Sequence, residues 1–374
     1  MYRRGLACDE FAVGAGMDNR SIAVVTGSLG LVGSAAVRRF DALGLDVVGI
    51  DNDGRRMFFG DESSTAPQLA LLQTELPRYR HLKLDIRDDQ PIDDLFRELG
   101  GRIAVVLHAA AQPSHDWAAR APRIDFAINA TATLSLLESV RAHAPEALFL
   151  YMSSNKVYGD GPNQLPLRAA ETRFVLPAEH PFAVHGIDET MPIDQCRHSL
   201  FGVSKTAADL MVQEYSSRFG LDTMVFRAGC ITGPEHRAVP DHGFLAYLCE
   251  RVAAGLPYTV VGYGGRQVRD NLHVDDLADA FAFAVSAPRV SGVYNIGGGP
   301  KATVSVSEAL DLAGRLTGRV PIVELVDEPR YGDHMWWVSD FRRFQAAYPA
   351  WRPSHGTDDL IAALVDAQLA RLAK

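Results

Sequence analysis

Short apolar runs alternate with longer helical patterns over the first 230 residues of the chain. Five runs of five or six residues, rich in β-branched side chains, stand at Ile22–Thr26, Asp46–Ile50, Ile103–His108, 148–153 and 223–227. Such runs are typical of parallel strands that are buried on both faces. Helical patterns fill the gaps between them at 31–43, 130–143 and 201–219. The alternation predicts an α/β fold, a doubly wound parallel sheet of the Rossmann type with helices on both faces.

The order of elements loosens after about residue 230, where helical patterns lie between glycine-rich turns near 243–255, 275–287 and 306–317. We expect a nucleotide-binding domain made mainly of residues 21–230 and a smaller C-terminal substrate domain, made mainly of 231–374, that is interleaved with it. Residues 1–20 are expected to form a flexible extension. The proline-rich stretch 160–200 has no clear periodicity, and a loop of that length is often functional. We expect it to be an insertion that acts as a lid.

A glycine-rich turn directly follows the first apolar run and opens a helical pattern. Gly27, Gly30 and Gly33 form the spacing G-x-x-G-x-x-G. Glycines in such a turn let the backbone approach a pyrophosphate, which sits at the positive end of the helix. Asp51 ends the second apolar run, 18 residues after Gly33. A carboxylate there accepts hydrogen bonds from the adenosine ribose and repels a 2′-phosphate, so the pattern predicts NAD rather than NADP.

Two arginines leave an alternative open, because Arg55 and Arg56 stand close enough along the chain to serve a 2′-phosphate. The segment Asp85-Ile86 follows another short apolar stretch and could hold the adenine edge. The cofactor contacts predicted from this part of the chain are Gly27, Leu29, Gly30, Leu31, Val32, Gly33, Asp51, Asn52, Asp85 and Ile86.

Charge and cysteine content exclude several classes of protein. The 374 residues carry 37 Lys and Arg against 46 Asp and Glu, a net charge of −9, which argues against nucleic acid and anionic membranes as partners. No apolar run approaches the ~18 residues of a membrane span, and charges interrupt the N-terminal region where a signal peptide would be apolar. The four cysteines lack metal-ligand spacing. We expect a cytoplasmic protein with reduced thiols and no metal site.

Four motifs, the glycine turn among them, carry a resemblance to a known family: TGxxGxxG at 26–33, HAAA at 108–111, SSNKVYG at 153–159 and RDNLHVDDL at 269–277. On these motifs the chain resembles the extended short-chain dehydrogenase/reductase family, in its NAD-dependent epimerase/dehydratase branch, over about residues 20–355. The resemblance implies a firmly held NAD, further cofactor contacts from His108, Ala109, Ala110, Ala111 and Lys205, and a homodimer paired through the helix at 201–219. It also implies that Arg269 and Arg330 clamp the diphosphate of a nucleotide sugar.

The resemblance further implies a Ser/Thr, a Tyr and a Lys at the nicotinamide. Ser154 falls on the first of these positions and Lys205 on the third, but Phe201 occupies the tyrosine position. The loss matters because oxidation of a carbinol also removes the hydroxyl proton, and a phenol with a lowered pKa performs that task. Three explanations remain open: another residue is the base, the proton passes through Ser154 and water, or the protein does not catalyse.

Three side chains are candidates for the missing base, in the order Glu189, Lys156 and His198. Glu189 lies in the long loop, where burial would raise the pKa of its carboxyl. Lys156 stands two residues after Ser154 and would face the same side of an extended backbone. His198 precedes the helix at 201–219, and an imidazole is a side chain suited to proton transfer. The predicted substrate contacts are Ser154, Asn155, Lys156, Phe201, Arg269 and Arg330.

The resulting prediction is an NAD-dependent epimerase that oxidises a carbinol of a nucleotide-linked sugar to a ketone and reduces it from the other face. The resemblance points to C2 of the sugar. Three alternatives stay open: the same chemistry at C2 or C3 of a nucleoside, nucleotide ribose or sugar phosphate; a sugar-nucleotide 4,6-dehydratase; and a non-catalytic NAD-binding protein, which the phenylalanine at position 201 alone supports.

Overall fold

A seven-stranded sheet, parallel throughout, forms the centre of the molecule. The computed structural model describes residues 22–373, so the extension expected for 1–20 lies outside the described residues. The strand order is β12-β8-β5-β4-β1-β2-β3, which confirms the predicted doubly wound α/β fold. These strands are β1 (Ile22–Thr26), β2 (Asp46–Ile50), β3 (Arg80–Leu82), β4 (Ile103–His108), β5 (Leu148–Ser154), β8 (Thr223–Ala228) and β12 (Gly292–Ile296).

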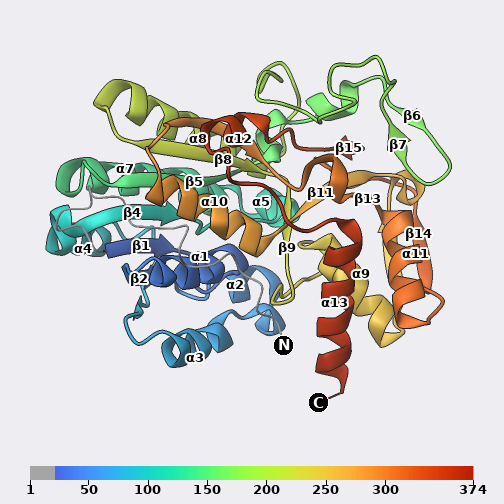
Figure 1. Ribbon diagram of the computed structural model, residues 1–374, viewed down its shortest axis with the longest axis horizontal. Helices are drawn as coiled ribbons and strands as arrows, with labels where there is room; N and C mark the ends of the chain where they lie inside the picture. Colours follow the sequence, from blue (N-terminus) through green and yellow to red (C-terminus); the bar gives the residue numbers. More distant parts are fainter. Residues whose placement is uncertain (1–21, 374) are drawn as a thin grey trace.

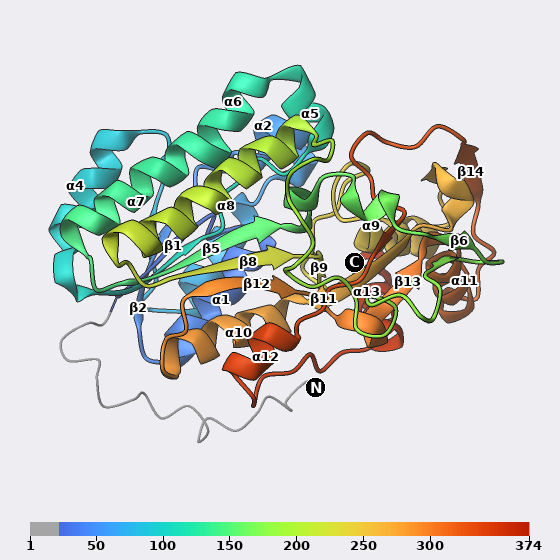
Figure 2. The ribbon, with the colours of Figure 1, turned by 90° about the horizontal axis from the view of Figure 1, so that it is seen from above.

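Helices cover both faces of this sheet, as Figure 2 shows. One face carries α1 (Leu31–Ala42), α3 (Ala66–Glu75), α10 (Val274–Ser286) and α12 (Arg342–Ala347). The other carries α4 (Asp89–Leu99), α7 (Ala132–His143) and α8 (Leu200–Phe219), with α5 (His115–Arg120) and α6 (Pro122–Phe126) at the end nearest the second domain. The short α2 (Arg55–Phe59) follows β2. All five residues of β1 are buried, because both faces of the strand meet a helical layer.

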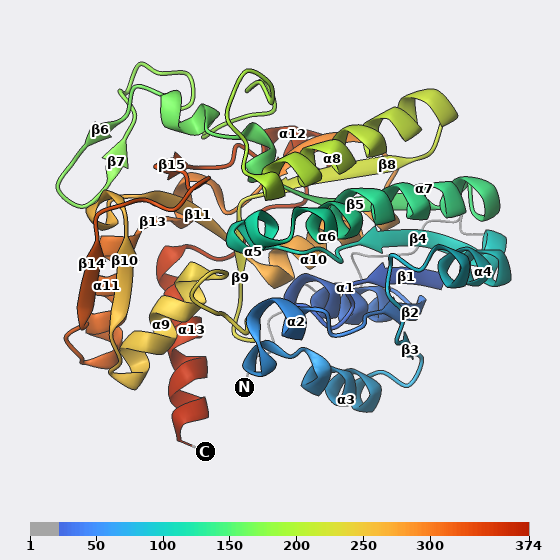
Figure 3. The ribbon, with the colours of Figure 1, turned by 180° about the vertical axis from the view of Figure 1, so that it is seen from behind.

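Smaller sheets and three helices build the other end of the molecule (Figures 1 and 3). The strands are β9 (Cys230–Thr232), β10 (Tyr258–Val261), β11 (Val268–His273), β13 (Thr303–Ser305), β14 (Val323–Val326) and β15 (Trp336–Trp337). The helices α9 (Phe244–Ala254), α11 (Val306–Thr317) and α13 (Thr357–Leu372) share one apolar core with β10. Between these elements the chain returns to the large sheet to form α10 and β12, so the two parts are interleaved.

The proline-rich stretch 160–200 runs along the outer side of the second domain. It contains the hairpin of β6 (Arg168–Ala169) and β7 (Phe174–Val175). Ile187 is fully buried in an apolar cluster with Val338 and the two tryptophans of β15, and its amide donates to the carbonyl of Val338 at 2.7 Å. The stretch is therefore a packed part of the molecule. No helix among residues 22–373 is long and apolar enough to cross a bilayer.

A buried ion pair joins α8 to the large sheet behind the strand ends. Arg227 on β8 donates through Nε and Nη2 to the two carboxylate oxygens of Asp209 on α8, at 3.0 and 2.9 Å. The Asp209 side chain is completely buried. It also accepts from Ser153 and Gln213, so every oxygen of this carboxylate has a partner. A hydrogen-bonded pair of this kind holds α8 in a fixed register on the sheet.

Candidate active site

A cavity of about 680 Å³ opens at the carboxyl ends of the parallel strands, where doubly wound sheets bind their ligands. One half is walled by the glycine turn after β1 and by the ends of β2 and β4. The other half is walled by β9, β10 and β11, by the start of α9 and by the loop 330–333. Both domains therefore contribute to one continuous site.

The glycine turn offers bare backbone to the first half of the cavity. Gly27 has a φ of +69°, and a Cβ built on it would stand 2.8 Å from the amide nitrogen of Ala110. A Cβ on Gly33 would stand 2.0 Å from the carbonyl oxygen of Gly27. Neither of these two positions has room for a side chain. The amino end of α1 is therefore left open to a phosphate group. This cradle fits the pyrophosphate of a dinucleotide.

Asp51 lies in the same half and is held in place by two backbone amides. Its carboxylate accepts from the N–H of Leu29 at 3.0 Å and of Asp53 at 2.8 Å, while burial raises its pKa. Arg55 donates to the carbonyl of Arg237 at 2.7 Å, and Arg56 pairs with the exposed Asp61. Arg55 lines the cavity with one nitrogen already bonded to that carbonyl, whereas Arg56 does not line it. The site therefore presents a carboxylate to the adenosine ribose, which fits NAD and disfavours a 2′-phosphate.

Residues 233–243 form a strap along the cofactor half, from the end of β9 to the start of α9. Glu235 in this strap accepts from Arg38 on α1 at 3.2 Å and from Gln68 on α3 at 3.1 Å. At its other end, the carbonyl of Pro240 accepts from Arg330 at 3.0 Å. Seven residues of the strap line the cavity. The strap thus connects the two domains across the side of the dinucleotide site.

Most of the predicted site residues line this one cavity. Those that do are Gly27, Leu29, Gly30, Leu31, Val32, Gly33, Asp51, Asn52, Asp85, Ile86, Ala109, Ala110, Ala111, Ser154, Lys156, Phe201, Lys205, Arg269 and Arg330. Four do not line it: His108, Asn155, Glu189 and His198. Residues far apart in the sequence are therefore brought together, but two of the three candidate bases are left outside.

His108 is a structural residue and not the predicted cofactor contact. Its ring is enclosed between Oγ1 of Thr26 at 2.7 Å and Oγ1 of Thr133 at 2.9 Å. Burial lowers the pKa of His108 to about 3, so the imidazole is neutral. It ties β1, β4 and α7 together beneath the site. Asn155 is likewise buried, and its side chain reaches the cavity only through the Ser154 hydroxyl, 3.4 Å away.

The structure also corrects the roles expected for Glu189 and His198. Glu189 accepts from the amide of Asn295 at 2.6 Å and therefore lies beside the edge strand β12. Nε2 of His198 lies 2.9 Å from the carbonyl of Ile193 and 3.3 Å from Sγ of Cys196. Both side chains bind partners outside the cavity, because the stretch 160–200 packs away from it. For the same reason none of that stretch lines the cavity, and we do not retain it as a lid.

Ser154, Phe201 and Lys205 all line the cavity. Lys205 donates from Nζ to the carbonyl of Met152 at 2.6 Å and lies 4.4 Å from the ring centroid of Tyr151. Burial lowers the pKa of Lys205 to about 7, against the opposing charges of Asp209 and Asp125. Phe201 lies one helical turn before Lys205 on α8, so a tyrosine here would face the same space. The lysine is in place but the phenol is not.

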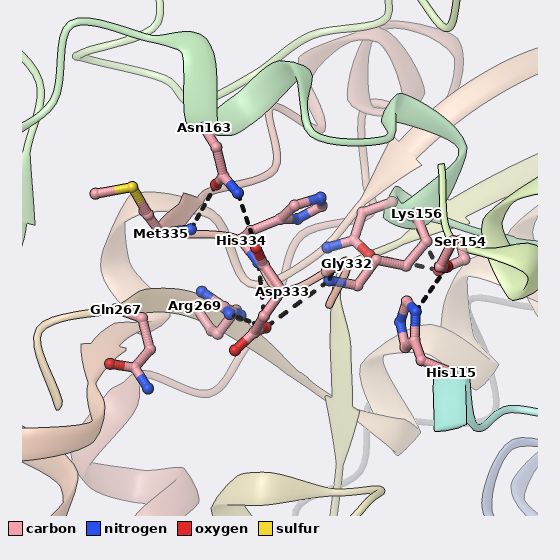
Figure 4. A network of polar contacts seen from close by, with 12 residues as sticks. His115, Ser154, Lys156, Asn163, Gln267, Arg269, Gly332, Asp333, His334 and Met335 are labelled. Atoms are coloured by element: carbon pink, nitrogen blue, oxygen red, sulfur yellow. Dashed lines mark hydrogen bonds and ion pairs between the residues drawn. The ribbon is translucent and has the colours of Figure 1, made fainter. Parts of the chain in front are cut away.

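Lys156 is the one predicted base that reaches the cavity, and Figure 4 shows it beside the loop 330–333. Its Nζ donates to the carbonyl of Gly332 at 2.9 Å and lies 4.0 Å from the carboxylate of Asp333. The side chain is only 16% exposed. Burial lowers the pKa of Lys156 to about 8, although the charge of Asp333 acts in the opposite direction. A lysine in this state exchanges a proton near neutral pH.

The two predicted phosphate ligands differ in their surroundings. Arg269 is buried, donates from Nη1 to the carbonyl of Val268 at 2.8 Å, and forms an ion pair with Asp333 through Nη2 (Figure 4). Its remaining N–H groups are available to an anion in the cavity. Arg330 is more exposed and lies 3.7 Å from Asp241. Both arginines line the substrate half, as expected of groups that bind a diphosphate.

Sequence reasoning missed His115 and Asp333, which both line the cavity. Asp333 follows the predicted Arg330 by three residues, so the segment R-Y-G-D carried a usable signal. His115 had none, because it begins the short α5 after an irregular loop. Cys230 also lines the cavity, and burial raises its pKa to about 11. No cluster of metal-ligating side chains is found in residues 22–373.

Comparisons with known proteins agree with this geometry. Residues 23–297 match the NAD dependent epimerase/dehydratase family. The chain is 31% identical to a CDP-paratose 2-epimerase of Salmonella typhi over 296 residues, which are 77% of this chain and 82% of that protein. It is 28% identical to a dTDP-glucose 4,6-dehydratase of Neisseria gonorrhoeae over 286 residues, 74% of this chain and 72% of that one. Its fold matches the crystal structure of a Thermus thermophilus UDP-glucose 4-epimerase in complex with NAD, with a TM-score of 0.74, 27% identity and coverage of 93% and 98%.

Proposed function

The chain belongs to the NAD dependent epimerase/dehydratase family, and on that premise we propose that it is an epimerase acting on a nucleotide-linked sugar, at C2 of the sugar ring. The observation that carries the proposal is the convergence of Ser154, Lys156 and Lys205 on a cavity whose other half is a dinucleotide cradle. Epimerisation of this kind needs one site for both cofactor and sugar. The relative from Salmonella typhi supports the choice of C2.

Bound NAD supplies the acceptor for the carbinol hydrogen and its two electrons and gives them back, so only the sugar changes configuration. The chain's own residues must handle the hydroxyl proton. We assign that proton to Lys156 Nζ, which accepts it as the carbinol becomes a ketone and returns it when the ketone is reduced on its other face. The Ser154 hydroxyl hydrogen-bonds the same oxygen. Lys205 also lines the cavity and fits the cofactor-binding role that its motif implies.

The substrate half supports a nucleotide-linked sugar rather than an uncharged one. Arg269 and Arg330 bring two guanidinium groups to this half of the cavity, where Asp333 pairs with the first and Asp241 lies 3.7 Å from the second. The remaining donors suit an anionic group such as a diphosphate. A free nucleoside would offer these guanidinium groups no anionic group to bind.

Cofactor content and solvent labelling test the proposal together. Denaturing the purified protein should release about one NAD per chain, and a protein without NAD would contradict internal recycling. CDP-, UDP-, GDP- and ADP-sugars should then be incubated with the holoprotein in deuterated water. An epimerase of this type leaves deuterium off the sugar carbons. A 4,6-dehydratase, the second candidate because of the dehydratase relatives, incorporates it during loss of water.

The rate should depend on pH through Lys156. Because its pKa is lowered to about 8, the neutral amine that accepts the proton is depleted as the pH falls below that value. We therefore expect kcat/KM to drop about tenfold per pH unit below about pH 7.5 and to level off above about pH 8.5. A pH–rate profile of the wild-type protein checks this. A profile that is flat, or that rises toward acid, would contradict the assignment.

We also propose that two copies pair through α8. Leu200, Val203 and Leu210 lie on one side of this helix and are all exposed, and Leu134 of the adjacent α7 is exposed as well. An apolar strip on two neighbouring helices is suited to a symmetric helix-to-helix contact. Leu210→Glu should weaken dimerisation at least about tenfold in sedimentation experiments, because it buries a charge. Leu325→Glu on β14, 69% exposed, is the matched control and should leave the dimer intact.

A further inference from the structure

His115 is the aromatic side chain that lies against Phe201 inside the cavity. The two ring centroids are 5.0 Å apart, with an interplanar angle of 64°. On its other side the ring touches the loop 330–333, since a Cβ on Gly332 would stand 2.9 Å from Nδ1. Figure 4 shows His115 near Ser154 and Lys156. The imidazole is therefore fixed between Phe201 and Gly332, in the space that faces the reacting groups.

A hydrogen bond to Ser199 determines which ring nitrogen carries the proton. The distance from His115 Nδ1 to Ser199 Oγ is 2.7 Å. Ser199 caps α8, and its Oγ already accepts from the amide of Gly202 at 3.1 Å. Within residues 22–373 the Ser199 hydroxyl hydrogen finds no other acceptor than Nδ1. Both groups are satisfied only when Nδ1 accepts, which leaves the imidazole hydrogen on Nε2.

Nε2 of His115 is open to the cavity. It has no hydrogen-bond partner in the described part of the chain. It is also not fully buried, so it remains accessible from the cavity that His115 lines. The ring is also neutral. Burial and then the charge of Lys156 lower the pKa of His115 to about 3, with Arg330 acting in the same direction and Asp333 in the opposite one. The cavity is thus presented with an N–H donor that keeps its proton across the neutral range.

From this geometry, and resting on the proposed epimerase function, we propose that His115 is a catalytic residue whose Nε2–H donates a hydrogen bond to the substrate oxygen at the carbon that is oxidised and reduced. This oxygen gains partial negative charge as the ketone is reduced, and a fixed donor stabilises that charge. A neutral imidazole can serve in this way because it needs no proton change of its own. His115 then supplies the donor that the phenylalanine at position 201 lacks, while Lys156 exchanges the proton.

The first test needs no substrate. In ¹⁵N-histidine-labelled holoprotein, the resonances of His115 are identified by their absence in the His115→Gln variant. We expect a neutral ring with its hydrogen on Nε2 from about pH 6 to about pH 8, where an ordinary histidine titrates. The Ser199→Ala variant should shift the balance between the two neutral forms. A hydrogen on Nδ1, or a titration in that range, would overturn the proposal.

The second test is a rescue experiment on turnover. His115→Leu should lower kcat about 100-fold or more and leave the NAD content unchanged, because the loss concerns the reacting oxygen. Adding Phe201→Tyr to that variant returns a hydroxyl donor to the same space and should restore at least about tenfold. A His115→Leu variant within about threefold of the wild type, or a double variant no faster than the single one, would overturn the proposal.

These outcomes separate the two proposals. If the wild-type holoprotein converts none of the nucleotide sugars, the proposed function fails, and the magnetic resonance experiment still decides the state of His115. If the wild type is active and His115 titrates or proves dispensable, the epimerase function stands and the inference about His115 alone fails.

Discussion

Replacing Lys156 by methionine should lower kcat/KM by about 10²–10⁴-fold, the range expected for loss of a general base. Methionine keeps much of the side-chain volume, so the cavity wall should be preserved. The amine is lost, and with it the group that receives the hydroxyl proton. The variant should also lose the pH dependence centred near about pH 8, because the group responsible for it is absent. Steady-state kinetics across the pH range measure both effects.

Glu189→Gln and His198→Asn are the matched controls for that variant. Both were candidate bases on sequence grounds, and both point to partners outside the cavity. Each should keep kcat/KM within about threefold of the wild type. If either of them falls as far as the lysine variant, the geometric choice between the three candidates is wrong.

Asp209→Leu should lower the free energy of unfolding by about 3–5 kcal/mol, because it leaves the buried guanidinium of Arg227 without its counter-ion. Denaturant unfolding followed by circular dichroism measures the loss. The double variant Asp209→Leu with Arg227→Met removes both charges and should recover most of it. A single variant as stable as the wild type would show that the pair does not hold α8 in place.

The central strands could be predicted because a strand buried on both faces consists of a short run of apolar residues, which is visible in the sequence. The apolar runs at Ile22–Thr26, Asp46–Ile50 and Ile103–His108 coincide with β1, β2 and β4. The edge strands were missed for a related reason. Arg80–Leu82 is short and only partly buried, and Gly292–Ile296 contains glycine and asparagine, so neither has the pattern of a doubly buried strand.

The cofactor half of the site could also be predicted from the sequence, because its glycines and Asp51 belong to one structural unit with fixed spacing. The catalytic base could not be predicted, because its identity depends on how segments far apart in the sequence pack together. Ile187 pairs with Ser339, a residue far along the chain, and that pairing turns Glu189 away from the cavity. His115 depends in the same way on three contacts from α8 and the loop 330–333, none of which has a local signature.

The strap at 233–243 has a consequence for how the protein would work in a cell. The contacts of Glu235 with Arg38 and Gln68 fasten the strap along the cofactor half of the cavity, and we expect them to slow the loss of a dinucleotide bound there. If the coenzyme stays bound through many catalytic cycles, each chain keeps its own NAD, which returns to its oxidised form at the end of every turnover. The reaction rate would then depend on the concentration of the sugar substrate. It would not depend on the ratio of oxidised to reduced coenzyme in the surrounding solution.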